Sequence, residues 1–373
     1  MSSIGLKILS KFYKIHYNPI EISFNNFESF KKTAENSTYV VFDKNLGWDI
    51  IKNGSAMDSF YVSNDQGIRR KNNIGVRKKK IRISSYGDSF VHCDDVSNEN
   101  TWQSFIEQRE KKFEVLNLGV GGYGTDQAFL KYKLTQKNLD ADMVLIGYMT
   151  ENSNRNVNTY RPFYIKNTQD INFSKPRFIY EKNQLRLIPN YFSSLNQMEV
   201  LAKKPKEHFN LLGADDYFFN NSYKSSLFDF LPSIRFINIS MDKICNSLVL
   251  EKQYSDNSEM FIVTKNIIEQ FYREVVLNNS LPLIVVFPNK WDVLELMRGN
   301  KLRYLGLLNF FEKNNLQYID LISIFNNIEL TREIIYNDLF IPHYSPFVNS
   351  LVANEIINKI DEIYSINKNI SDN

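Results

Sequence analysis

Two short continuous apolar runs stand out along the chain, at residues 143–146 and 283–286. A run of this kind is typical of a strand that is buried on both faces, as in a parallel sheet. Further stretches combine apolar and β-branched residues between polar turns. The pattern therefore predicts five strands, at residues 81–86, 114–118, 142–148, 283–287 and 317–322.

Helical periodicity fills the segments between these strands. Thr101 is a candidate N-cap before apolar residues at spacings of three and four, and Thr125 can begin a second helix of the same kind. Ser345 and Pro346 have the preferences of an N-cap and a first helical position. The closing helix that they introduce would bury Val348, Val352, Ile356, Ile360 and Ile363. The alternation predicts an α/β fold: a doubly wound, flavodoxin-like, mostly parallel five-stranded sheet in three α/β/α layers.

Two regions interrupt this alternation. Residues 1–80 predict an N-terminal extension packed on the core, and residues 153–256 predict an insertion that contains a hairpin. The main domain then comprises residues 81–152 and 257–373. Open α/β sheets bind ligands beyond the carboxyl ends of their strands. We therefore expect the insertion, which follows the third strand, to be a cap or a substrate-recognition element.

Composition narrows the class of protein. The 373 residues carry 45 Lys and Arg against 42 Asp and Glu, so the net charge of +3 gives no strong field for a nucleic-acid partner. The two cysteines, Cys93 and Cys245, are too few for a disulfide framework and suit a reducing compartment. No apolar run approaches the roughly 18 to 20 residues of a membrane span. These features predict a cytoplasmic protein and leave its oligomeric state open.

Residues 4–17 form a candidate amphipathic helix. Three lysines lie on its polar face, and its apolar face would comprise Ile4, Ile8, Leu9 and Phe12. This pattern fits a helix that makes weak contact with a membrane surface. It equally fits a terminal helix docked on the domain.

Candidate chemistry begins directly after the first predicted strand, at Gly87-Asp88-Ser89. A serine in a turn from strand to helix lies at the carboxyl edge of the sheet, where it can act as a nucleophile. A serine hydroxyl needs a base, and the chain has four histidines. Among them His343 stands just before the closing helix. Ser89 and His343 are therefore a candidate nucleophile and base.

A glycine-rich turn follows the second predicted strand. Its glycines let backbone amides approach a ligand. Gly119, Gly121 and Gly124 also have the G-x-G-x-x-G spacing of a dinucleotide-binding turn. That motif further requires an acidic residue near the end of the following strand, where this chain has only Glu151. Dinucleotide binding is therefore a minor alternative.

Asn152 lies just beyond the third predicted strand. Its amide can donate a hydrogen bond to an oxyanion. Together with the turn at Ser89, the glycine turn and His343, it resembles the SGNH/GDSL hydrolase family in order and context. By this resemblance Ser89 is the nucleophile, His343 is the general base, and the oxyanion hole comprises the amides of Ser89 and Gly122 and the side chain of Asn152. The resemblance implies no metal and no organic cofactor.

The chain departs from the family pattern at the orienting acid. The family commonly has Asp three residues before the histidine, where this chain has Phe340. Asp338, five residues before His343, is the nearest candidate, and a Ser-His dyad helped by a backbone carbonyl is the alternative. Asp88, Arg155 and Arg161 are candidate substrate-binding residues, the two arginines for a charged group.

Several flanking segments resemble SGNH proteins from bacterial surface-polysaccharide gene clusters. They are 46–48, 64–69, 160–163 and 175–178. The resemblance implies a serine esterase that removes an O-acetyl or other short acyl group from a sugar or glycan precursor in polysaccharide biosynthesis. The alternatives are an O-acyltransferase that uses the same serine and a glycan-binding or scaffolding module with little turnover.

Overall fold

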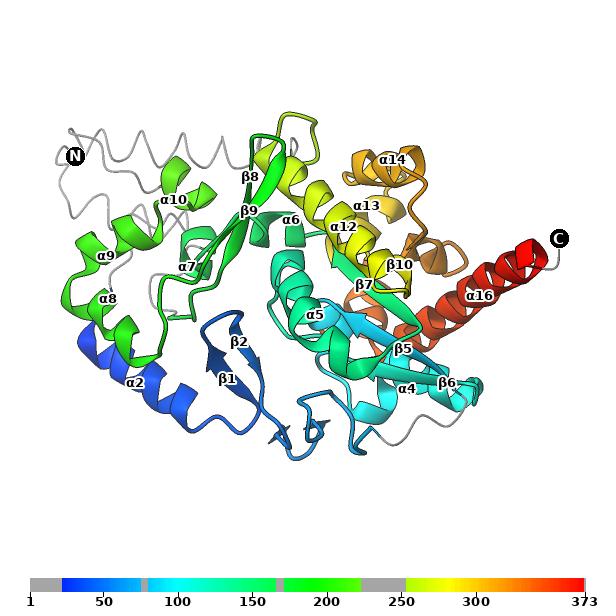
Figure 1. Ribbon diagram of the computed structural model, residues 1–373, viewed down its shortest axis with the longest axis horizontal. Coiled ribbons are helices and arrows are strands. Elements are labelled where there is room, and N and C mark those ends of the chain that lie inside the picture. Colours follow the sequence, from blue (N-terminus) through cyan, green and yellow to red (C-terminus); the bar gives the residue numbers. More distant parts are fainter. Residues whose placement is uncertain (1–21, 75–79, 166–170, 223–252, 372–373) are drawn as a thin grey trace. The chain divides into compact units, whose positions relative to one another are not determined.

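The computed structural model describes residues 22–74, 80–165, 171–222 and 253–371. The candidate amphipathic helix over residues 4–17 lies outside the described residues, and so does Cys245. Cys93 is a buried free thiol. The fold of the described part is shown in Figure 1.

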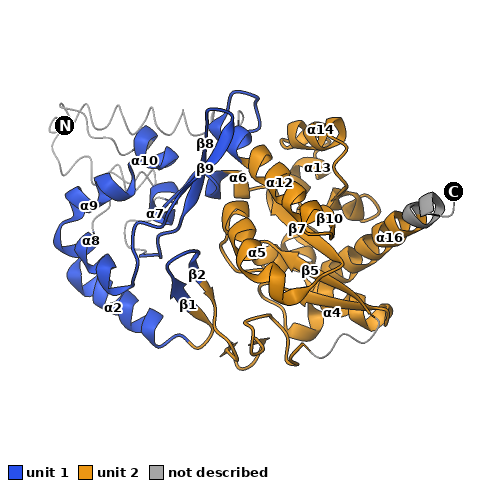
Figure 2. Ribbon diagram, in the orientation of Figure 1, with its two compact units in different colours: residues 1–37, 41–48, 154–263 blue, residues 38–40, 49–153, 264–373 orange. Residues whose placement is uncertain are grey.

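The chain divides into two compact units (Figure 2), each of which is described by itself. Unit 1 comprises residues 1–37, 41–48 and 154–263, and unit 2 comprises residues 38–40, 49–153 and 264–373. Of the residues that the sequence assigns to an extension, 38–40 and 49–74 thus cluster with the sheet, whereas 22–37 and 41–48 cluster with the inserted segment. The interpretation of the insertion as a cap stays a prediction.

Unit 2 contains a five-stranded sheet in which every pair of neighbours is parallel. Its order is β11-β10-β7-β5-β6, which is the flavodoxin-like order. The strands are β5 (Ile81–Tyr86), β6 (Phe113–Asn117), β7 (Met143–Met149), β10 (Leu281–Phe287) and β11 (Tyr318–Asp320). The predicted fold class is confirmed. The direction of winding changes at β5, between β6 and β7, so the ligand crevice is expected at the carboxyl ends of these strands.

The last strand is shorter than predicted, for a local reason. The Asp320 carboxylate accepts a hydrogen bond from the Ile322 backbone N–H at 3.1 Å and caps a 3-10 helix, η3 (Leu321–Phe325). The chain therefore leaves the sheet at Asp320, although its apolar pattern continues. The other predicted strands begin or end within two residues of the observed ones.

Helices cover both faces of the sheet. One face packs on α4 (Trp102–Arg109), α13 (Lys290–Met297) and α16 (Pro346–Ser371), with Ile83, Leu145 and Val285 pointing to this side. The other face packs on α5 (Thr125–Leu139) and α12 (Glu259–Leu277), where the rings of Tyr86, Tyr132 and Phe271 meet. These are the three predicted layers.

The helix starts follow the predicted caps. The Thr101 hydroxyl accepts the Ser104 N–H at 3.2 Å at the start of α4. Ser345 stands before Pro346, the first residue of α16. The five apolar residues predicted for the buried face of α16 all lie in the core: Val348, Val352, Ile356, Ile360 and Ile363.

The remaining elements are short. The hairpin predicted in the insertion is present as β8 (Arg177–Glu181) and β9 (Gln184–Ile188), paired antiparallel. The other helices are α2 (Phe24–Glu35), α3 (Ser89–His92), α6 (Asn152–Arg155), α7 (Arg161–Tyr164), α8 (Val200–Lys203), α9 (Pro205–Leu212), α10 (Tyr217–Ser222), α14 (Leu305–Lys313), α15 (Arg332–Ile334), the 3-10 helices η1 (Asn98–Asn100) and η2 (Asn196–Glu199), and the π-helix η4 (Ile335–Leu339). The other strands are β1 (Val40–Asp43), β2 (Gly47–Ile50), β3 (Ser55–Ala56) and β4 (Tyr61–Val62).

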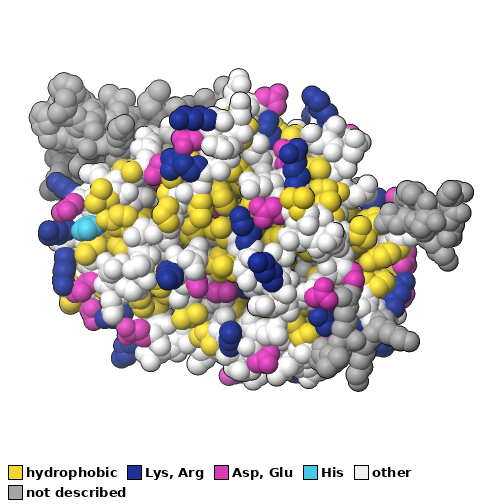
Figure 3. Space-filling view, in the orientation of Figure 1, with side chains coloured by type: hydrophobic (Ala, Val, Ile, Leu, Met, Phe, Trp, Pro, Cys, Tyr) yellow, Lys and Arg dark blue, Asp and Glu magenta, His cyan; other side chains and the backbone are white. Residues whose placement is uncertain are grey.

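The surface carries charges of both signs. On the face drawn in Figure 3, the Lys and Arg side chains of the described residues are interspersed with Asp and Glu. This mixture agrees with the small net charge of +3. Within the described part of the chain, no helix is long and apolar enough to cross a membrane.

Candidate active site

Ser89 stands at the carboxyl end of β5, as the first residue of α3. Asp88 is the N-cap of this helix, and its carboxylate accepts the Phe90 N–H at 3.0 Å. Asp88 and Ser89 are both buried. The structure thus uses the Asp88 carboxylate as a cap, and its contact with a substrate stays a prediction.

The helix α3 lies very close to the sheet, and glycines make this possible. A Cβ atom at Gly147 in β7 would lie 2.2 Å from Val91 Cγ2, and one at Gly87 would lie 2.3 Å from the same atom. A Cβ atom at Gly119 would lie 2.2 Å from the His92 backbone nitrogen. Any larger residue at these positions would push α3, and Ser89 with it, away from the sheet.

In the glycine-rich turn after β6, Gly122 and Gly124 have structural roles of their own. The Val120 carbonyl accepts the Tyr123 N–H at 3.2 Å, and Gly122 between them has φ +82°. A positive φ at this place in the turn is the type II geometry that favours glycine. Gly124 is the N-cap of α5, and its N–H donates to Gln127 Oε1 at 3.1 Å. Close packing and the turn thus explain the glycines at 119 and 122 without a dinucleotide, and Gly124 caps α5 through its backbone.

His343 is paired with an acid that the sequence analysis did not select. Its Nδ1 lies 2.6 Å from Asp95 Oδ2, and its backbone N–H donates to the same oxygen at 3.3 Å. An ionised carboxylate only accepts hydrogen bonds, so the imidazole proton is on Nδ1 and Nε2 is left as a proton acceptor. The two side chains are 25% and 28% exposed.

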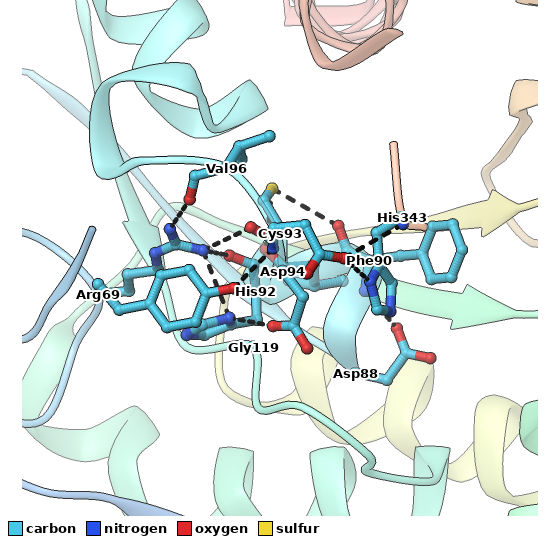
Figure 4. Close-up of polar contacts among 12 residues, drawn as sticks. Arg69, Asp88, Phe90, His92, Cys93, Asp94, Val96, Gly119 and His343 are labelled. Carbon is cyan, nitrogen blue, oxygen red and sulfur yellow. Dashed lines mark hydrogen bonds and ion pairs between the residues drawn. The ribbon is translucent and has the colours of Figure 1, made fainter. Parts of the chain in front are cut away.

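The His343 ring also packs edge-on against Phe90, with ring centroids 5.2 Å apart. Phe90 directly follows Ser89, so this contact brings the imidazole to the turn that carries the serine. Figure 4 shows His343 beside Phe90 and Asp88. The structure therefore places His343 against the residue that follows Ser89, and the roles of Ser89 and His343 as nucleophile and base stay predictions.

The structure does not bring Asp338 to His343, because no hydrogen bond joins the two among the described residues, and His343 pairs with Asp95 instead. Asp338 is exposed on the π-helix η4. The next two residues, Leu339 and Phe340, turn into the core instead, where the Phe340 ring meets Tyr344 at 5.3 Å. The acid beside the histidine comes from the other end of the sequence, just after the nucleophile.

Asp95 reaches His343 because the chain folds back after α3. The N–H of Asp94 donates to the Ser89 carbonyl at 2.9 Å, which closes the turn onto the serine. Cys93 and Asp95 have φ +64° and +69°. Asp tolerates this conformation better than most residues. The sequence gave no signal for Asp95 as an orienting acid, because two adjacent Asp residues are common in loops.

Asn152 lies just beyond the carboxyl end of β7, as the first residue of α6. Its side chain is 0% exposed, and neither its amide nitrogen nor its amide oxygen has a hydrogen-bond partner among the described residues. Leaving a buried polar group unpaired costs about 1–3 kcal/mol. Such a group in a native structure calls for an explanation, and a donor kept free for an oxyanion provides one.

His92 differs from His343 although it also pairs with an acid. It is 2% exposed, with Nδ1 2.5 Å from Asp94 Oδ1 and Nε2 2.8 Å from the Tyr39 hydroxyl. Burial, aided by the nearby Arg69 guanidinium, lowers the pKa of His92 to about 4. Both of its ring nitrogens are engaged, so His92 is neutral and is not the available base.

The remaining predicted residues lie in unit 1. Arg155 is buried at the end of α6, and Arg161 is the partly exposed first residue of α7. Their contact with a charged group of a substrate stays a prediction. Among the described residues, no group of three or more His, Cys, Asp or Glu side chains is arranged to hold a metal ion.

Among solved structures, those similar to this chain include lipolytic proteins and esterases. The chain is similar to a member of the lipolytic G-D-S-L family from Veillonella parvula DSM 2008, with 8% identity over 74% of this chain and 96% of that one and a TM-score of 0.38. It is similar to a psychrotrophic esterase from Pseudoalteromonas sp., with 10% identity, coverage of 77% and 100%, and a TM-score of 0.36. It is also similar to a catalytic mutant of an acetylxylan esterase from Geobacillus stearothermophilus, with 10% identity, coverage of 75% and 94%, and a TM-score of 0.38.

No family model matches the sequence, and no curated protein matches it. With likenesses of this size, the function has to be argued from the side chains of the site.

Proposed function

We propose that this chain is a serine ester hydrolase of the SGNH type, with Ser89, His343 and Asp95 as its triad. The observation that carries the proposal is the hydrogen-bonded pair of His343 and Asp95 beside the turn of Ser89. A carboxylate on Nδ1 fixes the tautomer and stabilises the imidazolium that forms when Nε2 takes a proton. The order Ser, Asp, His is the one expected by resemblance, but the acid lies six residues after the nucleophile instead of three residues before the histidine.

The reaction runs in two steps through an acyl-serine. Ser89 Oγ attacks the ester carbonyl while His343 Nε2 takes the hydroxyl proton, and the same proton then goes to the departing alcohol. Water next attacks the acyl-serine, gives its proton to His343, and releases the acid as the proton returns to Ser89. The oxyanion of each step accepts hydrogen bonds from the N–H groups of Ser89 and Gly122 and from Asn152 Nδ2.

The substrate class rests on resemblance. The segments at 46–48, 64–69, 160–163 and 175–178 resemble bacterial polysaccharide-cluster proteins, which extends the proposal to a short acyl ester, such as O-acetyl, on a sugar or glycan precursor in the cytoplasm. The segment 153–256 would then be the recognition element, with Arg155 and Arg161 on a charged group of the substrate.

The test is hydrolysis of p-nitrophenyl acetate, longer p-nitrophenyl esters and acetylated sugars by the wild-type protein and four variants. Ser89→Ala and His343→Ala should lose turnover, and Asp95→Asn should lose on the order of 10³- to 10⁴-fold in kcat because the imidazole loses its preferred tautomer. Asp338→Asn is the matched control and should retain wild-type kcat.

Each outcome has a consequence. Full turnover in Ser89→Ala would overturn the mechanism, and equal losses in Asp338→Asn and Asp95→Asn would overturn the assignment of the acid. A wild-type protein that binds acetylated glycans and hydrolyses none of these esters would favour the glycan-binding alternative. Acetyl transfer to an added sugar in preference to water would identify an acyltransferase.

A further inference from the structure

Two residues of the segment that precedes the sheet, Tyr61 and Arg69, make hydrogen bonds to the backbone of the turn that carries Asp95. The Tyr61 hydroxyl, from β4, accepts the Asp95 backbone N–H at 2.6 Å. The Arg69 guanidinium donates to the carbonyls of Cys93 at 2.6 Å, of Val96 at 2.5 Å, and of His92. Arg69 thus binds backbone carbonyls that precede Asp95 and one that follows it.

Arg69 is an unusual cation, because it is 4% exposed and its hydrogen bonds go to backbone carbonyls, to Asn98 and to the His92 ring nitrogen Nδ1 at 3.3 Å. Besides the carbonyls, Nε donates to Asn98 Oδ1 at 3.0 Å. The guanidinium also lies over the Tyr61 ring, 4.4 Å from its centroid. Burying a charge is expensive unless it is compensated, and here these hydrogen bonds and the nearby Asp94 carboxylate compensate the charge of Arg69.

The turn itself needs such support. Cys93 and Asp95 both have left-handed backbone angles, each of which costs about 1–3 kcal/mol for a residue other than glycine. Conformations of this kind persist only when surrounding contacts hold them, and they gather at functional sites. Figure 4 shows Arg69 on one side of Cys93 and Asp94, and His343 on the other.

We propose that Tyr61 and Arg69 are positioning residues for catalysis, which hold the Asp95 carboxylate on His343 Nδ1 through the backbone of the turn. The inference rests on the proposed esterase function. The proposal also assigns a role to the segment 64–69. Its last residue, Arg69, positions Asp95, which takes the place of the acid that the family commonly has where this chain has Phe340.

The test uses Tyr61→Phe, which keeps the ring beneath Arg69 and removes only the acceptor for the Asp95 N–H. Because small misplacements of catalytic groups cost up to about 100-fold, kcat should fall by about tenfold to a hundredfold with KM unchanged. The matched control is Tyr272→Phe, since the Tyr272 hydroxyl accepts the Gln317 N–H at 3.2 Å in the same unit. The control should keep wild-type kcat with a similar change in melting temperature.

A double-mutant cycle separates positioning from general destabilisation. If Tyr61 acts through Asp95, then Tyr61→Phe should cause no further loss of kcat in the Asp95→Asn background. Arg69→Lys, which keeps the charge but loses the planar fork, should show the same non-additivity. Multiplicative losses in the two cycles, or an equal loss of kcat in Tyr272→Phe, would overturn the inference. Failure of the esterase function itself would instead be seen as retained turnover in Ser89→Ala.

Discussion

The adjacent residues Asp94 and Asp95, which follow Ser89 closely in the chain, each pair with a histidine, and the surroundings of the two pairs give them different chemistry. The ring nitrogens of His92 contact Asp94 and Tyr39, and burial lowers its pKa to about 4. His343 and Asp95 are each about a quarter exposed. The buried pair of His92 and Asp94 is therefore structural. The more exposed pair of His343 and Asp95 is a candidate base with its orienting acid.

Asn152 leads to a prediction about activity and stability together. Replacing it with Leu, which has a similar shape, should lower kcat by about 100- to 1,000-fold, because one oxyanion donor is lost. The same variant should melt at an equal or higher temperature than wild type, because its buried amide has no partner among the described residues.

The matched control for this variant is Asn349→Leu. Asn349 is also buried, but its amide nitrogen donates to the Asn100 carbonyl at 3.2 Å, so the substitution should lower the melting temperature. A fall of the melting temperature in Asn152→Leu as large as that in Asn349→Leu would show that Asn152 is structural. Melting curves and steady-state kinetics on the same samples decide the question.

At the scale of elements, the position of Ser89 depends on how closely α3 approaches the sheet. Gly87 and Gly147 leave space for the same side chain, Val91, which is fully buried. A strand residue with any side chain at 147 would lift the helix from β7. The sequence shows Gly147 only as an interruption of an apolar run.

Gly147→Ala should therefore destabilise the protein. The new methyl group would lie 2.2 Å from Val91 Cγ2, and overpacking of this kind costs about 1–3 kcal/mol in the free energy of unfolding. Removing the clashing methyl groups with Val91→Ala should recover part of that loss in the double variant. Denaturant unfolding of the four proteins measures the coupling, and an equal cost of Gly147→Ala in both backgrounds would contradict the packing argument.

At the scale of the whole molecule, a half-buried carboxyl far from Ser89 in sequence, that of Asp320, affects the pH dependence of stability. Burial, with the nearby Asp292, raises the pKa of Asp320 from 3.8 to about 6. A carboxyl with a raised pKa stabilises the folded state at low pH, and this stabilisation is lost as the pH rises from about 4 to about 6. The shift corresponds to a change on the order of 3 kcal/mol.

Asp320→Asn should remove this part of the pH dependence. Asn remains a good N-cap for η3 and can still accept the Tyr304 hydroxyl, which donates to Asp320 at 3.1 Å. The free energy of unfolding of the variant should therefore rise relative to wild type between pH 4 and pH 7. The difference between the two proteins is the quantity to measure, because the lowered pKa of His92 acts in the opposite direction over this range. A difference that stays constant with pH would contradict the prediction.

The sequence by itself determined the sheet, the layers and the helix starts, because apolar periodicity and capping preferences are local and repeat along the chain. It also selected Ser89 and His343, since each stands at the end of an element that the pattern predicts. Which carboxylate pairs with His343 was decided by tertiary structure alone. A turn with left-handed backbone angles, bound by Arg69, places Asp95 at His343. Asp338 lies exposed on the π-helix η4. Hydrogen bonds between residues distant in sequence fix such geometry, and no local pattern in the chain records them.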